Sequence, residues 1–146
     1  MIEINNLTEF SINEKSFKKL TNDVLIGEGK KGAAISIAFI KEEEIKKINK
    51  QYLKKDYPTD VLSFSEAEVD YSEKKEQIGV GLLGEIVICP SQVEKNAKEL
   101  GLTFKKELNR VLIHGILHLL GYDHEGSEKE AKRMEKKEDY YLTLTD

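Results

Sequence analysis

Hydrophobic and polar positions along the chain follow two different periods. Four short segments are β-branched or alternate between apolar and polar residues, which is typical of strands: 2–4, 33–40, 60–66 and 82–89. Longer segments carry apolar residues at helical spacing, which predicts four or five helices: within 11–29, 41–53, about 91–100, about 104–120 and from 127 onward. The expected fold class is α+β, with a mixed four-stranded sheet packed with helices in a single domain over residues 1–146.

Local signals predict where some of these elements begin and end. Pro58 is expected to stop the second helix, because proline supplies no backbone N–H and biases its predecessor toward extended geometry. Ser91 with Glu94 predicts a capping box for the next helix, and Gly101 predicts its end. The polar span 67–81 is expected to be a loop.

Composition narrows the class of protein. Of 146 residues, 39% are hydrophobic and 34% are charged, which is typical of a soluble globular chain. The longest apolar run, 111–120, is too short to cross a bilayer, and no signal peptide is evident, so we expect a cytoplasmic protein. Cys89 is the only cysteine and is expected to be a buried residue at a strand end. The net charge of -4 argues against a protein that coats nucleic acid by bulk electrostatics.

All three histidines of the chain lie within "HGILHLLGYDH", residues 114–124. His114 and His118 are four residues apart in a helical pattern, so their side chains lie on one face about one turn apart. Gly121 can adopt the left-handed conformation that ends a helix, and the reversal brings His124 back toward the same point. Three neutral imidazoles bind zinc at about 2.0 to 2.1 Å and leave a fourth position open for water. The segment therefore predicts one zinc ion in a catalytic type of site.

The alternative is that each histidine is a core or surface residue with its own hydrogen bond. Burying two imidazoles on so apolar a helix without partners would be costly, whereas one shared cation supplies partners for both. The zinc peptidase pattern HExxHxxGxxH has the same histidine spacing, but Gly115 stands where its glutamate, the general base, would be. The residues therefore favour a hydrolysis that does not depend on this glutamate as general base, such as that of a phosphodiester bond.

The same segment closely resembles the signature HGxLHLxGYDH of the bacterial YbeY family of metal-dependent endoribonucleases. Two further segments support the resemblance, "PTDVLSF" at 58–64 and "LGEIVIC" at 83–89, which is similar to the family's LGDIVI. The resemblance implies a zincin-like fold, one zinc ion held by His114, His118 and His124, and cleavage of single-stranded RNA. It also implies a role in 3′ end maturation of 16S ribosomal RNA and in ribosome quality control. The implied partners are ribosomal RNA and the small ribosomal subunit or a protein associated with it, with no membrane.

The chain departs from the family pattern just before PTDVLSF. The family has an arginine directly after the tyrosine of that segment, placed to contact substrate phosphate, and here Leu53 follows Tyr52. We expect Lys54 or Lys55 to supply the charge, although a lysine is a flexible point donor and does not reproduce bidentate phosphate binding. A smaller departure is Ser65, where the family has proline.

Several polar residues outside the histidine motif are candidates for supporting roles. Glu85 lies in an otherwise apolar strand, where it either faces solvent at a sheet edge or enters a cleft to accept a proton. Glu107 and Arg110 are predicted to form an intrahelical ion pair worth about a few tenths of a kcal/mol, with Arg110 reaching RNA phosphate as the alternative. Asp123 either orients a ligand imidazole or hydrogen-bonds the turn backbone, and the turn role is favoured. Tyr122 either stacks on a base or packs under the turn, and packing is the commoner role.

The favoured function is a zinc-dependent endoribonuclease that acts on ribosomal RNA precursors. In this hypothesis His114 belongs to the metal site, Lys54 helps to neutralise phosphate charge, and Glu85 accepts a proton. One alternative is a ribosome-binding assembly factor with a mainly structural metal, which Leu53 keeps open. The other is a metallopeptidase-like hydrolase with a base from elsewhere in the chain, against which Gly115 argues.

Overall fold

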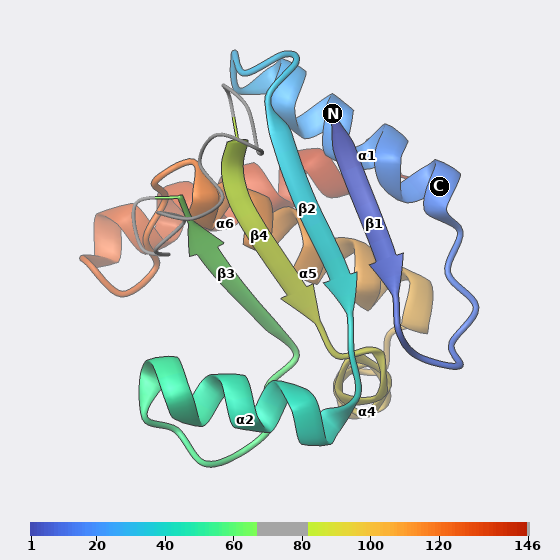
Figure 1. The fold of residues 1–146 in the computed structure, drawn as a ribbon. Helices are drawn as coiled ribbons and strands as arrows, with labels where there is room; N and C mark the ends of the chain where they lie inside the picture. Colours follow the sequence, from blue (N-terminus) through green and yellow to red (C-terminus); the bar gives the residue numbers. More distant parts are fainter. Residues whose placement is uncertain (67–81, 146) are drawn as a thin grey trace.

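Four strands form one mixed sheet in the computed structural model, which describes residues 1–66 and 82–145. The loop expected at 67–81 lies outside the described residues. The strands are β1 (Ile2–Asn6), β2 (Ala34–Phe39), β3 (Val61–Ser65) and β4 (Leu82–Ile88), in the order β1-β2-β4-β3. Strands β1, β2 and β4 run parallel, and β3 runs antiparallel to β4 at one edge (Figure 1). The predicted mixed four-stranded sheet is confirmed.

Five helices are found in the two described ranges, and together with the sheet they confirm the α+β class. They are α1 (Glu14–Gly27), α2 (Glu42–Leu53), α4 (Pro90–Leu100), α5 (Phe104–Leu119) and α6 (Glu128–Leu142). None of these helices is both long enough and apolar enough to cross a membrane.

The main hydrophobic core lies between one face of the sheet and the helices α1, α5 and α6, which stand behind the sheet in Figure 1. Ile37 and Ile86 of the sheet and Leu112 of α5 are completely buried in this core. Each such side chain stabilises the fold by about 1.5 to 3 kcal/mol relative to an exposed one. A smaller core on the other face joins Ile45 of α2 to Val87 of β4. The sheet is therefore covered on both faces, with α5 and α2 on opposite sides.

The end of α2 differs from the prediction, because Pro58 does not stop this helix. Lys54 adopts the left-handed conformation with φ of 60°, which a residue other than glycine rarely does. The N–H of Lys55 then donates to the carbonyl of Asn49 at 3.3 Å. The helix thus ends at Leu53 through a local backbone turn, upstream of the proline.

The start of α4 also differs from the predicted capping box. The helix begins at Pro90, whose fixed backbone angle suits the first helical position, and Cys89 occupies the cap. Ser91 instead donates its hydroxyl to Glu42 Oε1 at 3.0 Å and so links α4 to α2. Cys89 is 0% exposed directly after β4, as predicted, and Gly101 ends α4 with φ of 68°.

Helix α5 packs closely on the sheet at Gly115. A Cβ at this position would lie 3.1 Å from Cγ2 of Ile86 and 3.2 Å from Oγ of Ser63, which is a tight contact and leaves no space for a long side chain. The hydroxyl of Ser63 donates to the carbonyl of Gly115 at 3.2 Å. Position 115 therefore faces the sheet, and the glutamate of the peptidase pattern would not fit there.

Candidate metal centre

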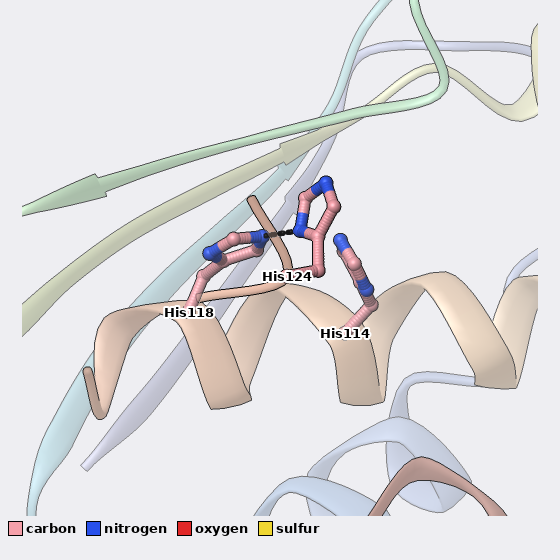
Figure 2. Close-up of side chains that lie close together, drawn as sticks. All are labelled: His114, His118 and His124. Atoms are coloured by element: carbon pink, nitrogen blue, oxygen red, sulfur yellow. Dashed lines mark hydrogen bonds between the residues drawn. The ribbon is translucent and has the colours of Figure 1, made fainter. Parts of the chain in front are cut away.

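The structure brings the three histidines together at the C-terminal end of α5. His114 and His118 project from one face of α5, and His124 returns from the turn that follows it (Figure 2). One ring nitrogen from each residue lies within 4.8 Å of the other two. The ring centroids are 4.6 to 5.1 Å apart, and His124 Nδ1 lies 3.1 Å from His118 Nε2. The rings therefore converge on one point, as the spacing in the sequence predicted.

The turn after α5 is a Schellman motif, which satisfies the last helical carbonyls. Gly121 has φ of 98°, and its N–H donates to the carbonyl of His118 at 3.0 Å. The N–H of Tyr122 donates to the carbonyl of Leu117 at 3.0 Å. Because glycine adopts this conformation without steric cost, it reverses the chain sharply and returns His124 toward the helix.

His114, the first of the three histidines, is oriented by a carboxylate from another helix. His114 Nδ1 hydrogen-bonds to Oε1 of Glu138 in α6. The side chains of His114 and Glu138 are 24% and 13% exposed, so the bond is shielded from water. The other ring nitrogen, Nε2, stays available to a ligand. Metal-binding histidines commonly have such a carboxylate partner, which fixes the tautomer and the direction of the ring.

The electrostatics of the cluster favour a neutral imidazole at His118. Burial lowers the pKa of His118, and the neighbouring His114 and His124 lower it further because a second positive ring would repel the first. A neutral ring keeps a lone pair for a cation. Ligands of a tetrahedral zinc lie about 3.4 Å apart, close to the 3.1 Å between His118 and His124. These three histidines can hold a metal ion, and their donor set fits zinc.

The histidines line a cleft of about 630 Å³ that follows the edge strand β3. One side of the cleft, which we call the α5 wall, consists of Arg110, His114 and His118 with His124 from the turn. The opposite side, which we call the α2 wall, consists of Tyr52, Leu53, Tyr57 and Phe64. The α5 wall is polar and the α2 wall is largely aromatic and apolar.

Arg110 lies on the α5 wall one turn before His114. Its Nε and Nη2 donate to the two carboxylate oxygens of Glu107 at 2.6 and 2.7 Å, and Glu107 is 0% exposed. The hydrogen bonds with Glu107 raise the pKa of Arg110 above its ordinary value. The predicted pair exists, but it is a buried bidentate bond rather than a weak surface pair. Glu107 thus fixes a cation at the rim of the histidine cluster.

Lys54, predicted to assist at the phosphate, lies outside this cleft. It borders a separate depression with Lys47 and Lys50 of α2, and its Nζ lies 3.5 Å from the carbonyl of Gln51. Lys55 lines the histidine cleft instead. The left-handed backbone of Lys54 turns the chain between the two lysines, which the sequence pattern did not predict.

Glu85 is likewise not brought to the histidines. It lies on β4, an interior strand, in register with Ser36 on one side and Phe64 on the other. Its neighbour Ile86 faces Gly115 of α5, and side chains alternate along a strand, so Glu85 points to the opposite face of the sheet. The described residues that line the cleft do not include it.

A second polar cluster lies beside the same turn, and we call it the Glu28 cluster. Glu28, with its side chain 8% exposed, accepts hydrogen bonds from Tyr122 at 2.5 Å, from Lys137 at 3.2 Å and from Tyr141. Burial alone would raise the pKa of Glu28, but the three donors outweigh it and the pKa is lowered. The predicted packing of Tyr122 under the turn is confirmed. Asp123 Oδ1 accepts the N–H of Glu125 at 2.8 Å, which confirms its turn role.

Known proteins resemble this chain over most of its length. A family model described as Endoribonuclease YbeY matches residues 3–145. A protein of Persephonella marina named Endoribonuclease YbeY is 44% identical over 88% of this chain and 80% of its own. One of the same name from Aquifex aeolicus is 36% identical over 94% of this chain and 87% of its own.

Other relatives are matched over less of their own length. A Thermotoga petrophila protein named Endoribonuclease YbeY is 44% identical over 74% of this chain, and the match spans 65% of that protein. Among solved structures, the solution structure of TM1509 from Thermotoga maritima superposes with a TM-score of 0.67 at 38% identity. It covers 97% of this chain and 87% of the other.

Proposed function

Because this chain belongs to the YbeY endoribonuclease family, we propose that it is a metal-dependent endoribonuclease that cleaves single-stranded RNA. The observation that carries the proposal is the convergence of three imidazoles and a fixed arginine in one cleft. In this proposal residues 1–146 act as one hydrolase domain.

The metal ligands would be His114, His118 and His124, and the donor set favours zinc. A zinc ion bound there would supply positive charge against a phosphate oxygen and lower the pKa of a bound water. Glu138 holds the ring of His114 through Nδ1, so that Nε2 faces the other two rings. The protein's own contribution at this point is a ligand set fixed by two helices and a Schellman turn.

Arg110 is the residue that we assign to the RNA phosphate. Two of its N–H groups are taken by Glu107, which leaves its remaining N–H groups for an incoming anion. Because the guanidinium is already fixed by a buried carboxylate, little side-chain freedom is lost when phosphate binds. Lys55, on the same cleft, adds a more flexible positive charge. Arg110 thereby compensates for Leu53, which stands where the family pattern has an arginine.

We further propose ribosomal RNA precursors of the small subunit as the substrate and the cytoplasm as the place of action. Support comes from the family to which the chain belongs. The cleft suits an RNA strand because Arg110 and Lys55, which can bind phosphate, line it beside the histidines.

The test is cleavage of end-labelled single-stranded RNA by the zinc-loaded protein, with a duplex of the same sequence in parallel. We expect cleavage of the single strand, loss on chelation, recovery with zinc, and a decrease of at least about 10³-fold in His114→Ala. Elemental analysis of the purified protein should find one zinc per chain. Cleavage that survives chelation, or that His114→Ala leaves intact, contradicts the proposal.

The competing function is that of an assembly factor in which the metal is mainly structural. Leu53, an apolar side chain 49% exposed in the cleft, favours it because it removes a charge that the family pattern places there. A folded His114→Ala variant separates the two functions when tested for complementation of ribosomal RNA processing in cells. A binding factor tolerates this change, and an enzyme does not.

A further inference from the structure

The α2 wall of the cleft exposes more aromatic and apolar surface than a solvated surface needs. Tyr52 is 55% exposed, Tyr57 is 53% exposed and Leu53 is 49% exposed, and all three border the histidine cleft. Contiguous exposed apolar surface next to polar groups commonly marks a ligand site. The wall is therefore suited to a partner with flat apolar faces.

Two aromatic rings of this wall pack together. The rings of Tyr52 and Phe64 have centroids 5.2 Å apart and planes tilted by 59°. Phe64 belongs to β3 and packs against the smaller core, so it supports Tyr52 from behind. Because Tyr52 is still 55% exposed, a large part of its side chain faces the solvent in the cleft.

Tyr57 is held in place by a buried polar residue. Asn49 is 1% exposed, and its Nδ2 donates to the carbonyl of Tyr57 at 2.8 Å. The other amide atom, Oδ1, is buried and has no hydrogen-bond partner among the described residues, which is costly. The bond to Tyr57 fixes the backbone from which the second aromatic side chain of the cleft extends.

The opposite wall carries the complementary chemistry for a nucleotide. Arg110 and the histidines suit a phosphate, whereas Tyr52 and Tyr57 suit a base, because every nucleobase has a π-face that stacks on an aromatic ring. The volume of about 630 Å³ lies within the range of small-molecule sites, about 300 to 1,000 Å³. A single cleft thus offers separate surfaces to the two halves of one nucleotide.

We propose that Tyr52 and Tyr57 form a nucleobase-binding subsite, in which one unstacked base of the RNA strand lies against the α2 wall while its backbone lies along the α5 wall. This inference rests on the proposed function. It gives a physical reason for single-strand selectivity, because a base within a duplex is stacked and cannot reach the tyrosines without the cost of unpairing.

The experiment measures binding of two fluorescent tetranucleotides to the zinc-loaded full chain by anisotropy. One is a 2′-O-methyl RNA, which resists cleavage, and the other carries tetrahydrofuran spacers that keep the phosphates and remove every base. We compare the unmodified protein with Tyr52→Ala and Tyr52→Phe. Tyr140→Ala is the matched control, because Tyr140 is exposed to the same degree, 56%, but lies on α6 outside the cleft.

We expect Tyr52→Ala to weaken binding of the RNA by about tenfold or more, in line with the stacking of one base on one aromatic ring. The Tyr52→Phe variant keeps the ring and should bind within about twofold of the unmodified protein, as should the Tyr140→Ala control. The base-free oligomer should bind more weakly, and Tyr52→Ala should not weaken it further, because the contact that the change removes is already absent.

Any other result contradicts the proposal of a nucleobase subsite. Equal weakening of both oligomers by Tyr52→Ala would indicate a phosphate or structural effect, and no weakening of either would show that no base stacks on Tyr52. Both results leave cleavage of single-stranded RNA in place, so the proposed function survives them. An unmodified protein that neither binds nor cleaves RNA fails both. If Tyr52→Ala loses its helical circular dichroism, Tyr57→Ala takes its place in the same comparison.

Discussion

Two polar clusters share the turn after α5, and they differ in what they leave unsatisfied. In the Glu28 cluster each donor that the structure describes points at one carboxylate, and the three hydrogen bonds close the group. In the histidine cluster three ring nitrogens point at one another within 4.8 Å, and a single hydrogen bond joins two of them. The first arrangement is complete among the described residues, and the second can hold a cation.

This difference separates a structural cluster from a functional one on physical grounds. Polar groups that bond to one another form a closed structural cluster, whereas ring nitrogens that converge on an open point in a cleft are candidates for binding a ligand. Both clusters are tied to α6, through Glu138 in one case and Tyr141 in the other. Two results would contradict this distinction: a large loss of metal-free stability when a histidine is replaced, or a large loss of RNA cleavage when the Glu28 cluster is changed.

The largest expected effect is on the histidine side. Replacing His118 by alanine should reduce RNA cleavage by at least about 10³-fold. It should change the free energy of unfolding of the metal-free protein by less than about 1 kcal/mol, because His118 is only partly buried. Cleavage assays and urea unfolding with a chelator present measure the two quantities. A large loss of metal-free stability would mean that this cluster is also structural.

The second prediction concerns the Glu28 cluster, where a substitution should affect stability and not cleavage. Glu28→Gln should lower the free energy of unfolding at neutral pH by about 2 kcal/mol, because bonds to a charged acceptor are replaced by weaker ones. The cleavage rate of the folded protein should stay within about twofold. The folded pKa of Glu28 lies below its ordinary 4.5, so its stabilisation is complete above that pH and is lost as the pH falls through the folded pKa.

The pH dependence of this variant supplies the decisive control. Urea unfolding of the unmodified protein and of Glu28→Gln should show a difference in the free energy of unfolding at neutral pH, and this difference should shrink below pH 4.5. A difference that stays constant with pH would mean that the glutamine acts through packing rather than through the lost charge.

A smaller effect concerns the link between α6 and the histidines. Glu138→Gln should weaken zinc binding by about tenfold, because the charged partner of His114 Nδ1 is replaced by a neutral one. Competition with a chromogenic chelator measures the affinity. Glu135→Gln, an exposed glutamate on the same helix, is the matched control and should leave it unchanged. Equal affinities of the two variants would show that Glu138 does not position the histidine.

The smallest effect is expected from Tyr141→Phe. The ring stays in the core and only one donor to Glu28 is lost, so the free energy of unfolding should fall by about 1 kcal/mol. Thermal unfolding of this variant beside Tyr140→Phe, whose side chain is 56% exposed, gives the comparison. A loss as large as that of Glu28→Gln would mean that the hydroxyl of Tyr141 is the main support of the cluster.

The two clusters also differ in how far the sequence predicts them. The histidines lie in one helix and the turn behind it, so their spacing alone is enough to place them on a common point. The partners of Glu28 are 94 to 113 residues away in the chain, and no periodicity links such positions. Glu138 follows His114 by 24 residues in a stretch full of charges, so nothing singles it out.

The sheet and helices are predicted well because hydrophobic periodicity is a local signal in the sequence. The positions of single side chains depend on tertiary packing and are predicted less well. Lys55 lines the histidine cleft and Lys54 does not, because the left-handed backbone of Lys54 turns the chain between them. Glu85 faces away from the cleft because strand alternation assigns each side chain to a face only once the strand order is known. Glu107 looks like a surface glutamate until α5 is packed on the sheet, where it becomes fully buried.

The bond between His114 and Glu138 has a consequence for the order in which the protein matures. During synthesis the ribosome adds Glu138 as the 24th residue after His114. A nascent chain that has just emerged with all its imidazoles still lacks the helix that aligns the first of them. Because α6 follows the histidine motif in the chain, we expect the full affinity of the three imidazoles for a cation only after α6 has docked against α5.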